Sequence, residues 1–146
     1  MARVKLVSQG LALGLHCLSL RGATTSRADL QTDFIYVNVS ETWKNAQSYC
    51  RVKHTDLASV RNQSENEQLK MMLINSPTWI GLYRNSWMWS DGSAYSFPNW
   101  APNKPLSDDN YSCGTIFLEK WHNSACNGYN YFLCYTGELS FVLATI

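Results

Sequence analysis

A strand pattern followed by a helical pattern opens the regularly patterned part of the chain. Residues 34–39 (FIYVNV) are mostly β-branched or aromatic, which predicts a short strand. From Trp43 to Lys53, large side chains recur every three or four residues, which predicts a helix over about 41–53. Ser40 stands just before this helix and is its expected N-cap.

A second helix is expected shortly afterwards. Ser64 and Glu67 stand three residues apart in the capping-box arrangement, in which each side chain can bond to the other's backbone N–H. The sequence Asn-Ser-Pro at 75–77 then ends the helix at about Leu73, because the residue before a proline avoids helical geometry.

The second half of the chain favours strands around one long loop. Residues 79–83 and 87–89 have strand character, and a turn sequence follows the second of them. Residues 96–112 are rich in Pro, Asn, Asp and Ser, which predicts an irregular loop of a length that is usually functional. Further strand candidates are 113–118, 119–122 and 131–135. Two helices followed by a run of strands indicate the α+β fold class.

The composition fits one globular domain and argues against nucleic-acid binding. The 146 residues are 45% hydrophobic and 16% charged, which suffices for one core. The net charge is +1, and the Lys and Arg residues are scattered rather than gathered in a run that could follow a phosphate backbone. Tryptophans are buried on average, so four of them are expected in the core: Trp79, Trp89, Trp100 and Trp121.

The N-terminal segment predicts secretion. Arg3 and Lys5 precede a short apolar stretch at 11–20, and small and polar residues follow, as in a signal peptide covering 1–26. No stretch reaches the ~18 apolar residues of a membrane span, and the tail at 137–146 is too short to form one. The expected organisation is a leader, one domain over 34–136 and a short tail, in an extracellular protein.

The cysteines also indicate an extracellular, oxidising compartment. Cys17 lies in the leader, and four cysteines remain: Cys50, Cys113, Cys126 and Cys134. This even number predicts a disulfide framework, for which three pairings are possible. A zinc site that includes His122 is the competing interpretation, but no Cys-x-x-Cys knuckle accompanies these residues. Three Asn-x-Ser/Thr sequons mark possible glycosylation sites: Asn38, Asn62 and Asn110.

Several ordered motifs together resemble a C-type-lectin-like domain of the short, four-cysteine form. They are Trp43 with Cys50, DLASV at 56–60, WIGL at 79–82, WMWSDG at 87–92, FPNWAP at 97–102, Cys113, WHNSAC at 121–126 and FLC at 132–134. Domains of this kind occur in secreted lectins and in tandem receptors of the mannose-receptor type. The resemblance implies two helices against small antiparallel sheets, a long irregular loop, and disulfides Cys50–Cys134 and Cys113–Cys126.

The resemblance also implies a calcium site that has lost its ligands. Sugar-binding members hold calcium with a Glu-Pro-Asn or Gln-Pro-Asp tripeptide, acidic residues before the cysteine that corresponds to Cys113, and a Trp-Asn-Asp motif. The corresponding positions here are Lys104-Pro105-Leu106, Tyr111, Ser112 and Trp121-His122-Asn123. Calcium takes six to eight oxygen ligands, and only Asn123 keeps a suitable one. No cofactor is therefore expected.

The remaining side chains at these positions form the candidate ligand surface: Lys104, Leu106, Tyr111, His122 and Asn123. Their mixed aromatic, apolar and cationic character favours a protein or glycan ligand bound without calcium. If Lys104 lies beside His122, its charge should lower the pKa of the imidazole. The alternatives are a calcium-dependent lectin that uses Asp108, Asp109 and Asn123, and a loop surface with no partner.

An enzyme is not expected. His54 with Asp56, and His122 near Ser124, are the acid–base hints in the sequence, and neither comes with a nucleophile elbow, a metal-ligand motif or a phosphate loop. A further interpretation is that the chain is one unit of a multi-domain receptor. Recognition, rather than catalysis, is the predicted activity.

Overall fold

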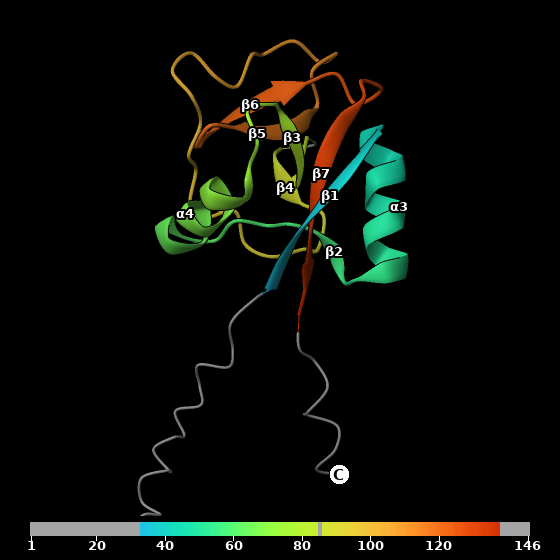
Figure 1. Ribbon diagram of the computed structural model, residues 1–146. Coiled ribbons are helices and arrows are strands. Elements are labelled where there is room, and N and C mark those ends of the chain that lie inside the picture. Colours follow the sequence, from blue (N-terminus) through green and yellow to red (C-terminus); the bar gives the residue numbers. More distant parts are fainter. Residues whose placement is uncertain (1–32, 85, 138–146) are drawn as a thin grey trace, which may run out of the picture. The chain divides into compact units, whose positions relative to one another are not determined.

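One mixed β-sheet runs through the part of the chain that the computed structural model describes, residues 33–84 and 86–137 (Figure 1). The order of its main strands is β1-β7-β3-β5-β6, with β2 added beside β7 and β4 beside β3. The strands are β1 (Asp33–Glu41), β2 (Asp56–Leu57), β3 (Thr78–Tyr83), β4 (Met88–Trp89), β5 (Cys113–Phe117), β6 (Lys120–Ser124) and β7 (Asn130–Thr136). The helices are α3 (Trp43–Lys53) and α4 (Gln63–Met72), so the predicted α+β class is confirmed.

The small antiparallel sheets that were expected are joined into one sheet by a single parallel pair. β3 runs parallel to β7, whereas β1, β2, β4, β5 and β6 pair antiparallel with their neighbours. Strand periodicity indicates which residues share a face but not which strands become neighbours. The parallel pairing of β3 with β7, which joins the antiparallel parts into one sheet, is therefore set by the tertiary structure.

The first helix starts two residues later than predicted. Thr42 caps α3, because its hydroxyl accepts a hydrogen bond from the backbone N–H of Asn45 at 3.3 Å. The prediction of Ser40 as the cap is wrong because β1 continues past it, and Glu41 still pairs with Asn130 of β7. Strand pairing thus delays the start of the helix.

The second helix is also capped by a different residue. Asn62 accepts the backbone N–H of Glu65 at 2.9 Å, and Glu65 in turn accepts the backbone N–H of Arg61 at 2.8 Å. The reciprocal capping therefore uses residues two positions before the predicted Ser64 and Glu67. Ser64 lies inside the first turn, where its hydroxyl cannot act as the N-cap.

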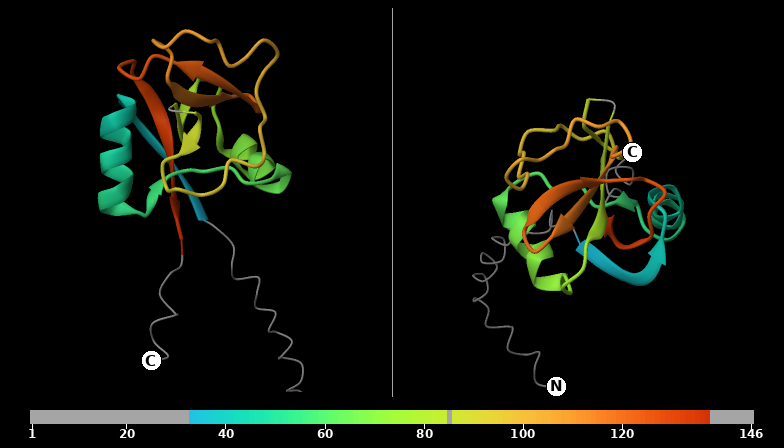
Figure 2. Two further views of the ribbon diagram at one scale, coloured as in Figure 1. Left: turned by 180° about the vertical axis from the view of Figure 1, so that it is seen from behind. Right: turned by 90° about the horizontal axis from the view of Figure 1, so that it is seen from above.

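The sheet has an apolar cluster on each face, because its strands carry large side chains at successive positions. Ile35 and Val37 of β1 pack into one cluster, and Phe34 and Tyr36 pack against the other. The first cluster includes residues of α3 and the second includes Leu69 of α4. Figures 1 and 2 accordingly show the two helices on opposite sides of β1 and β7.

Two disulfides tie these parts together, and both pairings implied by the family resemblance are confirmed. Cys50–Cys134 joins α3 to β7 across a sequence separation of 84 residues. Cys113–Cys126 joins β5 to the segment before β7 across 13 residues. Chain-entropy arithmetic gives about 4–5 kcal/mol for the longer loop and about 3 kcal/mol for the shorter one.

Gly81 in β3 allows the backbone at Leu57 and Ala58 to approach this strand closely. A Cβ at this position would stand 3.1 Å from the carbonyl oxygen of Leu57 and 3.3 Å from that of Ala58. The N–H of Gly81 donates to the same Ala58 carbonyl at 2.8 Å. The absence of a side chain therefore permits this close approach.

Three of the four tryptophans expected in the core are fully buried, and the fourth is not. Trp79, Trp89 and Trp121 are at most 1% exposed. Trp100 is only half-buried: it packs edge-to-face on Trp121 and its Nε1 donates to the hydroxyl of Tyr95 at 2.7 Å. Placing Trp100 in the core was wrong, because it belongs to the loop that lies over the core.

Asp91, in the turn after β4, anchors that turn to the domain. Its carboxylate accepts the hydroxyl of Ser59 at 2.8 Å and both the hydroxyl and the backbone N–H of Ser93. Burial by itself raises the pKa of Asp91, but these hydrogen bonds and one from Tyr135 outweigh it, so the pKa is lowered. Burial together with Asp91 raises the pKa of Tyr135.

The predicted leader at 1–26 lies outside the described residues, as does all but the first residue of the predicted tail at 137–146. Neither described helix has the length and hydropathy that crossing a bilayer requires.

Candidate functional site

The long loop at 96–112 begins as a ribbon along β6 and then leaves it. The N–H of Ala101 donates to the carbonyl of Trp121 at 2.9 Å, and the N–H of Trp121 donates to the carbonyl of Asn99 at 3.0 Å. After Ala101 the chain passes through a cis peptide bond at Lys104–Pro105. Figures 1 and 2 show this gold-to-orange segment arching above β5 and β6.

Asn123 fastens the tip of this loop to β6. Its carboxamide oxygen accepts the N–H of Leu106 at 2.8 Å, and its Nδ2 donates to the carbonyls of Leu106 at 2.9 Å and Tyr111 at 2.8 Å. The residue is only 4% exposed. Both amide protons and the amide oxygen are therefore engaged by backbone groups of the chain itself.

Arg84, just after β3, places a positive charge beneath the same tip. Its Nη2 donates to the carbonyl of Asp108 at 2.8 Å and lies 3.3 Å from the carbonyl oxygen of Leu106 and 3.5 Å from that of Tyr111. Its guanidinium also stands 5.2 Å from the centre of the Trp87 ring. Arg84 thus gathers three backbone carbonyls from one loop.

Sequence reasoning did not select Arg84, because no local pattern connects it with residues 22 or more positions away. The same holds for the bonding role of Asn123, which was identified only as the one remaining oxygen donor. Both roles depend on β3 and β6 lying on either side of β5 beneath the loop.

The two loop acids do not converge on a shared point with Asn123. One oxygen of Asp108 accepts both the backbone N–H and the Nδ2 of Asn110, at 2.9 Å each, in a local turn. The side chain of Asp109 is 99% exposed and lies 3.9 Å from Arg84 Nη1. Across 33–84 and 86–137, no three His, Cys, Asp or Glu side chains gather in a way that could hold a metal ion.

His122 and Asn123 are neighbours in sequence but face opposite sides of β6. Asn123 turns inward to the loop, whereas the ring of His122 lies 6.3 Å from that of Phe117 on β5. Burial lowers the pKa of His122, and the charge of Lys104 lowers it further. The expected effect of Lys104 on His122 is therefore confirmed in direction.

The five residues of the predicted ligand surface thus fall into two groups. Leu106 and Tyr111 are held by Asn123 through their backbones, and their side chains remain 40% and 37% exposed. Lys104 and His122 interact electrostatically, with the imidazole on the opposite face of β6 from Asn123. The loop presents apolar and aromatic side chains on one part and cationic character on another.

Comparison with known proteins places this architecture in a family. Residues 39–136 match the family model of the lectin C-type domain. The chain belongs to the C-type lectin domain family. E-selectin of Equus caballus is 31% identical to this lectin domain, over 65% of the chain and 18% of the selectin. L-selectin of Rattus norvegicus is 30% identical, over 70% of the chain and 32% of the selectin.

Solved structures share the fold of this lectin domain. A calcium-independent type II antifreeze protein superposes with a TM-score of 0.71 at 23% identity, covering 75% of this chain and 88% of that one. Human lithostathine superposes with a TM-score of 0.67 at 25% identity, covering 72% and 83%. The selectins named above are much longer proteins, of which the chain spans a third or less.

The acid–base hints in the sequence have structural explanations in the lectin domain. Asp56 is 4% exposed and accepts hydrogen bonds from Arg51 Nε at 3.1 Å and the hydroxyl of Ser90 at 2.7 Å. His54 Nδ1 lies 3.4 Å from the hydroxyl of Thr136 instead. Proteins of this family are generally binding modules rather than enzymes.

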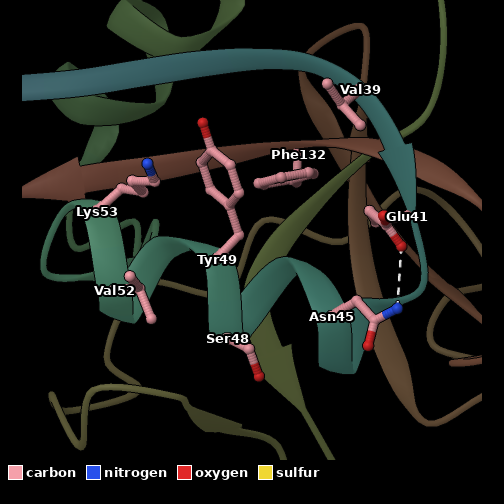
Figure 3. A pocket seen from close by; sticks show the side chains of 8 residues that line it. All are labelled: Val39, Glu41, Asn45, Ser48, Tyr49, Val52, Lys53 and Phe132. Carbon is pink, nitrogen blue, oxygen red and sulfur yellow. Dashed lines mark hydrogen bonds between the residues drawn. The ribbon is translucent and has the colours of Figure 1, made fainter.

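A groove in the lectin domain lies between β1 and α3, and sequence reasoning missed it (Figure 3). It is a groove of about 390 Å³. Its lining is Val39 and Glu41 of β1, Asn45, Ser48, Tyr49, Val52 and Lys53 of α3, and Phe132 of β7. The helical residues stand at intervals of three and four, which is the sequence signal that could have revealed it.

Proposed function

We propose that this lectin domain is an extracellular recognition module that binds a protein or glycan ligand by direct contact with the long loop, without calcium. The observation that carries the proposal is that Arg84 and Asn123 already bond the loop carbonyls. Calcium needs six to eight oxygen ligands at about 2.3–2.6 Å. Here the carbonyls of Leu106, Asp108 and Tyr111 accept hydrogen bonds from the chain itself.

The side chains at the calcium-ligand positions support the same conclusion. Lys104 contributes an ammonium group, Leu106 has no side-chain oxygen, and the single oxygen of Asn123 accepts the N–H of Leu106. A divalent ion about 4 Å from a lysine or arginine charge would meet a repulsion of about 8 kcal/mol at an effective dielectric of 20. The residues present do not fit the ion.

The exposed part of the loop supports a binding role. The side chains of Leu106 and Tyr111 are substantially exposed, although their backbones are held, and a tyrosine side chain has only two χ angles and loses little entropy on binding. The fold is compatible with calcium independence, since the antifreeze protein that shares it is described as calcium-independent. The two disulfides favour an oxidising, extracellular setting.

The test for calcium uses the refolded full chain. Titration calorimetry with calcium chloride should give no binding heat, and thermal unfolding should be the same in millimolar calcium and in EDTA. Micromolar binding would overturn the proposal and favour the alternative, a site built from Asp108, Asp109 and Asn123. The variant D108N/D109N should then lose the heat.

The test for a ligand screens glycans and extracellular protein ectodomains in EDTA. Binders should weaken at least tenfold with Tyr111→Ala, as for a central aromatic contact. Tyr129→Ala is the matched control, because Tyr129 is 70% exposed and lies outside the long loop. Binding that EDTA abolishes, or that Tyr129→Ala weakens as much as Tyr111→Ala, would contradict a calcium-free site on the loop.

A further inference from the structure

The groove between β1 and α3 exists because β1 diverges from β7 there. β1 pairs regularly with β7 up to Val37, opposite Phe132, and then bulges before Glu41 pairs again, opposite Asn130. Four positions along β1 thus match two along β7, so the strand bends away from its neighbour. Val39, within the bulge, is 53% exposed beside α3.

The helix contributes a second stripe next to its buried one. The buried residues of α3 are Trp43, Ala46, Gln47 and Cys50. Tyr49, which is 39% exposed, stands about a third of a turn from them, and Val52, which is 79% exposed, about half a turn. Tyr49 rises from α3 toward β1, and its ring stands edge-to-face on Phe132 at 5.3 Å (Figure 3). The groove therefore has apolar walls and an aromatic floor.

The two ends of the groove differ in charge and in bonding. At one end Glu41 accepts a hydrogen bond from Asn45 Nδ2 at 3.0 Å (Figure 3). At the other end Lys53 has no ion-pair or hydrogen-bond partner within the described part of the chain. Tyr49 stands four positions before Lys53, so the two side chains share one face of the helix, and its hydroxyl is likewise uncommitted there.

We propose that this groove binds a medium-chain aliphatic carboxylate, with its hydrocarbon chain between Val39, Val52 and Tyr49 and its carboxylate on Lys53 and the tyrosine hydroxyl. Each CH₂ group removed from water contributes about 0.8 kcal/mol. The volume lies within the range of small-molecule sites, and the Lys53 ammonium, which has no partner among the described residues, favours a negative head group. The site is separate from the long loop and does not depend on the function proposed for it.

The experiment titrates the ¹⁵N-labelled full chain, refolded with both disulfides, with sodium octanoate and follows backbone amide shifts. Shifts should be confined to the groove and saturate below about 1 mM, as expected for a ligand of this size with partial burial. Octan-1-ol tests the apolar walls without a charge, and octylammonium tests the opposite charge. Both should bind at least tenfold more weakly than octanoate.

Two variants with matched controls locate the binding. Lys53→Ala should raise the octanoate Kd about tenfold, whereas Lys44→Ala, on the same helix outside the groove, should leave it unchanged. Val52→Asn should weaken octanoate and octan-1-ol alike, whereas Met71→Asn, at an 85% exposed position of α4, should not. All four positions are exposed, so folding is retained and is checked by the unperturbed amide spectrum.

Three results would overturn the proposal. They are the absence of saturable shifts up to 10 mM octanoate, equal affinity for octanoate and octan-1-ol, and an unchanged Kd in Lys53→Ala. None of these outcomes bears on calcium or on ligands of the long loop, so the two proposals fail independently.

Discussion

Replacing Arg84 by methionine tests whether a protein side chain, rather than an ion, organises the long loop. Methionine keeps an unbranched apolar stem against Trp87 but removes the charge and the donors. The shortest of the three contacts, 2.8 Å to the carbonyl of Asp108, counts as one charge-assisted hydrogen bond. Such a bond contributes about 1.5–3 kcal/mol, and the contact with Trp87 adds about 0.5–1 kcal/mol.

We expect a loss of about 2 kcal/mol, because the freed carbonyls are partly exposed and regain water. If the loop opens without the rest of the domain, the loss appears locally as faster amide exchange. The amide of Leu106, which donates to Asn123, should then exchange about 30-fold faster, the factor that corresponds to 2 kcal/mol. The amide of Ala101, at the base of the loop, serves as the internal reference.

Arg84→Lys is the matched control for this experiment. It keeps the charge but not the planar fork that reaches several carbonyls, so it should recover part of the protection at Leu106. Unchanged exchange at Leu106 in the methionine variant would refute the role assigned to Arg84. Equal acceleration at Ala101 would instead indicate general destabilisation and would also count against that role.

Three further variants test other contacts. Asp91 has a lowered pKa in the folded state, so its stabilising contribution is present above the ordinary carboxyl pKa and is lost as pH falls through the folded value. Asp91→Asn should therefore flatten the acid side of a curve of Tm against pH. An unaltered acid side would contradict this. Gly81→Ala should lower the free energy of unfolding in urea by about 1–3 kcal/mol, because its Cβ would press on the carbonyl of Leu57. An unchanged free energy would mean that the backbone at Leu57 and Ala58 shifts to make room for the methyl group. Asn123→Ala should cost about 2–4 kcal/mol, since it leaves backbone groups of the loop unpaired; a change below 0.5 kcal/mol would show that water replaces the side chain.

Local chemistry accounts for most of the elements but not for where the helices begin. The β-branched and aromatic residues at 34–39 and the helical spacing after Trp43 correctly predicted a strand and a helix at β1 and α3. The N-caps were misplaced because the predicted and the observed caps have comparable intrinsic preferences: Ser40 against Thr42, and Ser64 against Asn62. Pairing of Glu41 with Asn130 decided the first boundary, and that partner lies far along the chain.

The candidate site divides in the same way. The sequence by itself determined which chemical groups stand at the calcium-ligand positions: an ammonium at Lys104, an aliphatic chain at Leu106 and one carboxamide at Asn123. It also determined the disulfide framework through the resemblance that its motifs carry. These features follow from residue identity, which needs no coordinates.

Only the tertiary structure decided which side chains hold the tip of the long loop and where a groove forms on the domain. Arg84 reaches the carbonyls of residues 106–111 because the sheet places β3 and β5 side by side beneath the loop. The groove opens because β1 bulges away from β7 next to α3, and Lys53 and Val39 line it from two elements that no local pattern relates. Both features arise from the packing of distant segments, whose relative positions are set by the whole core rather than by the residues themselves.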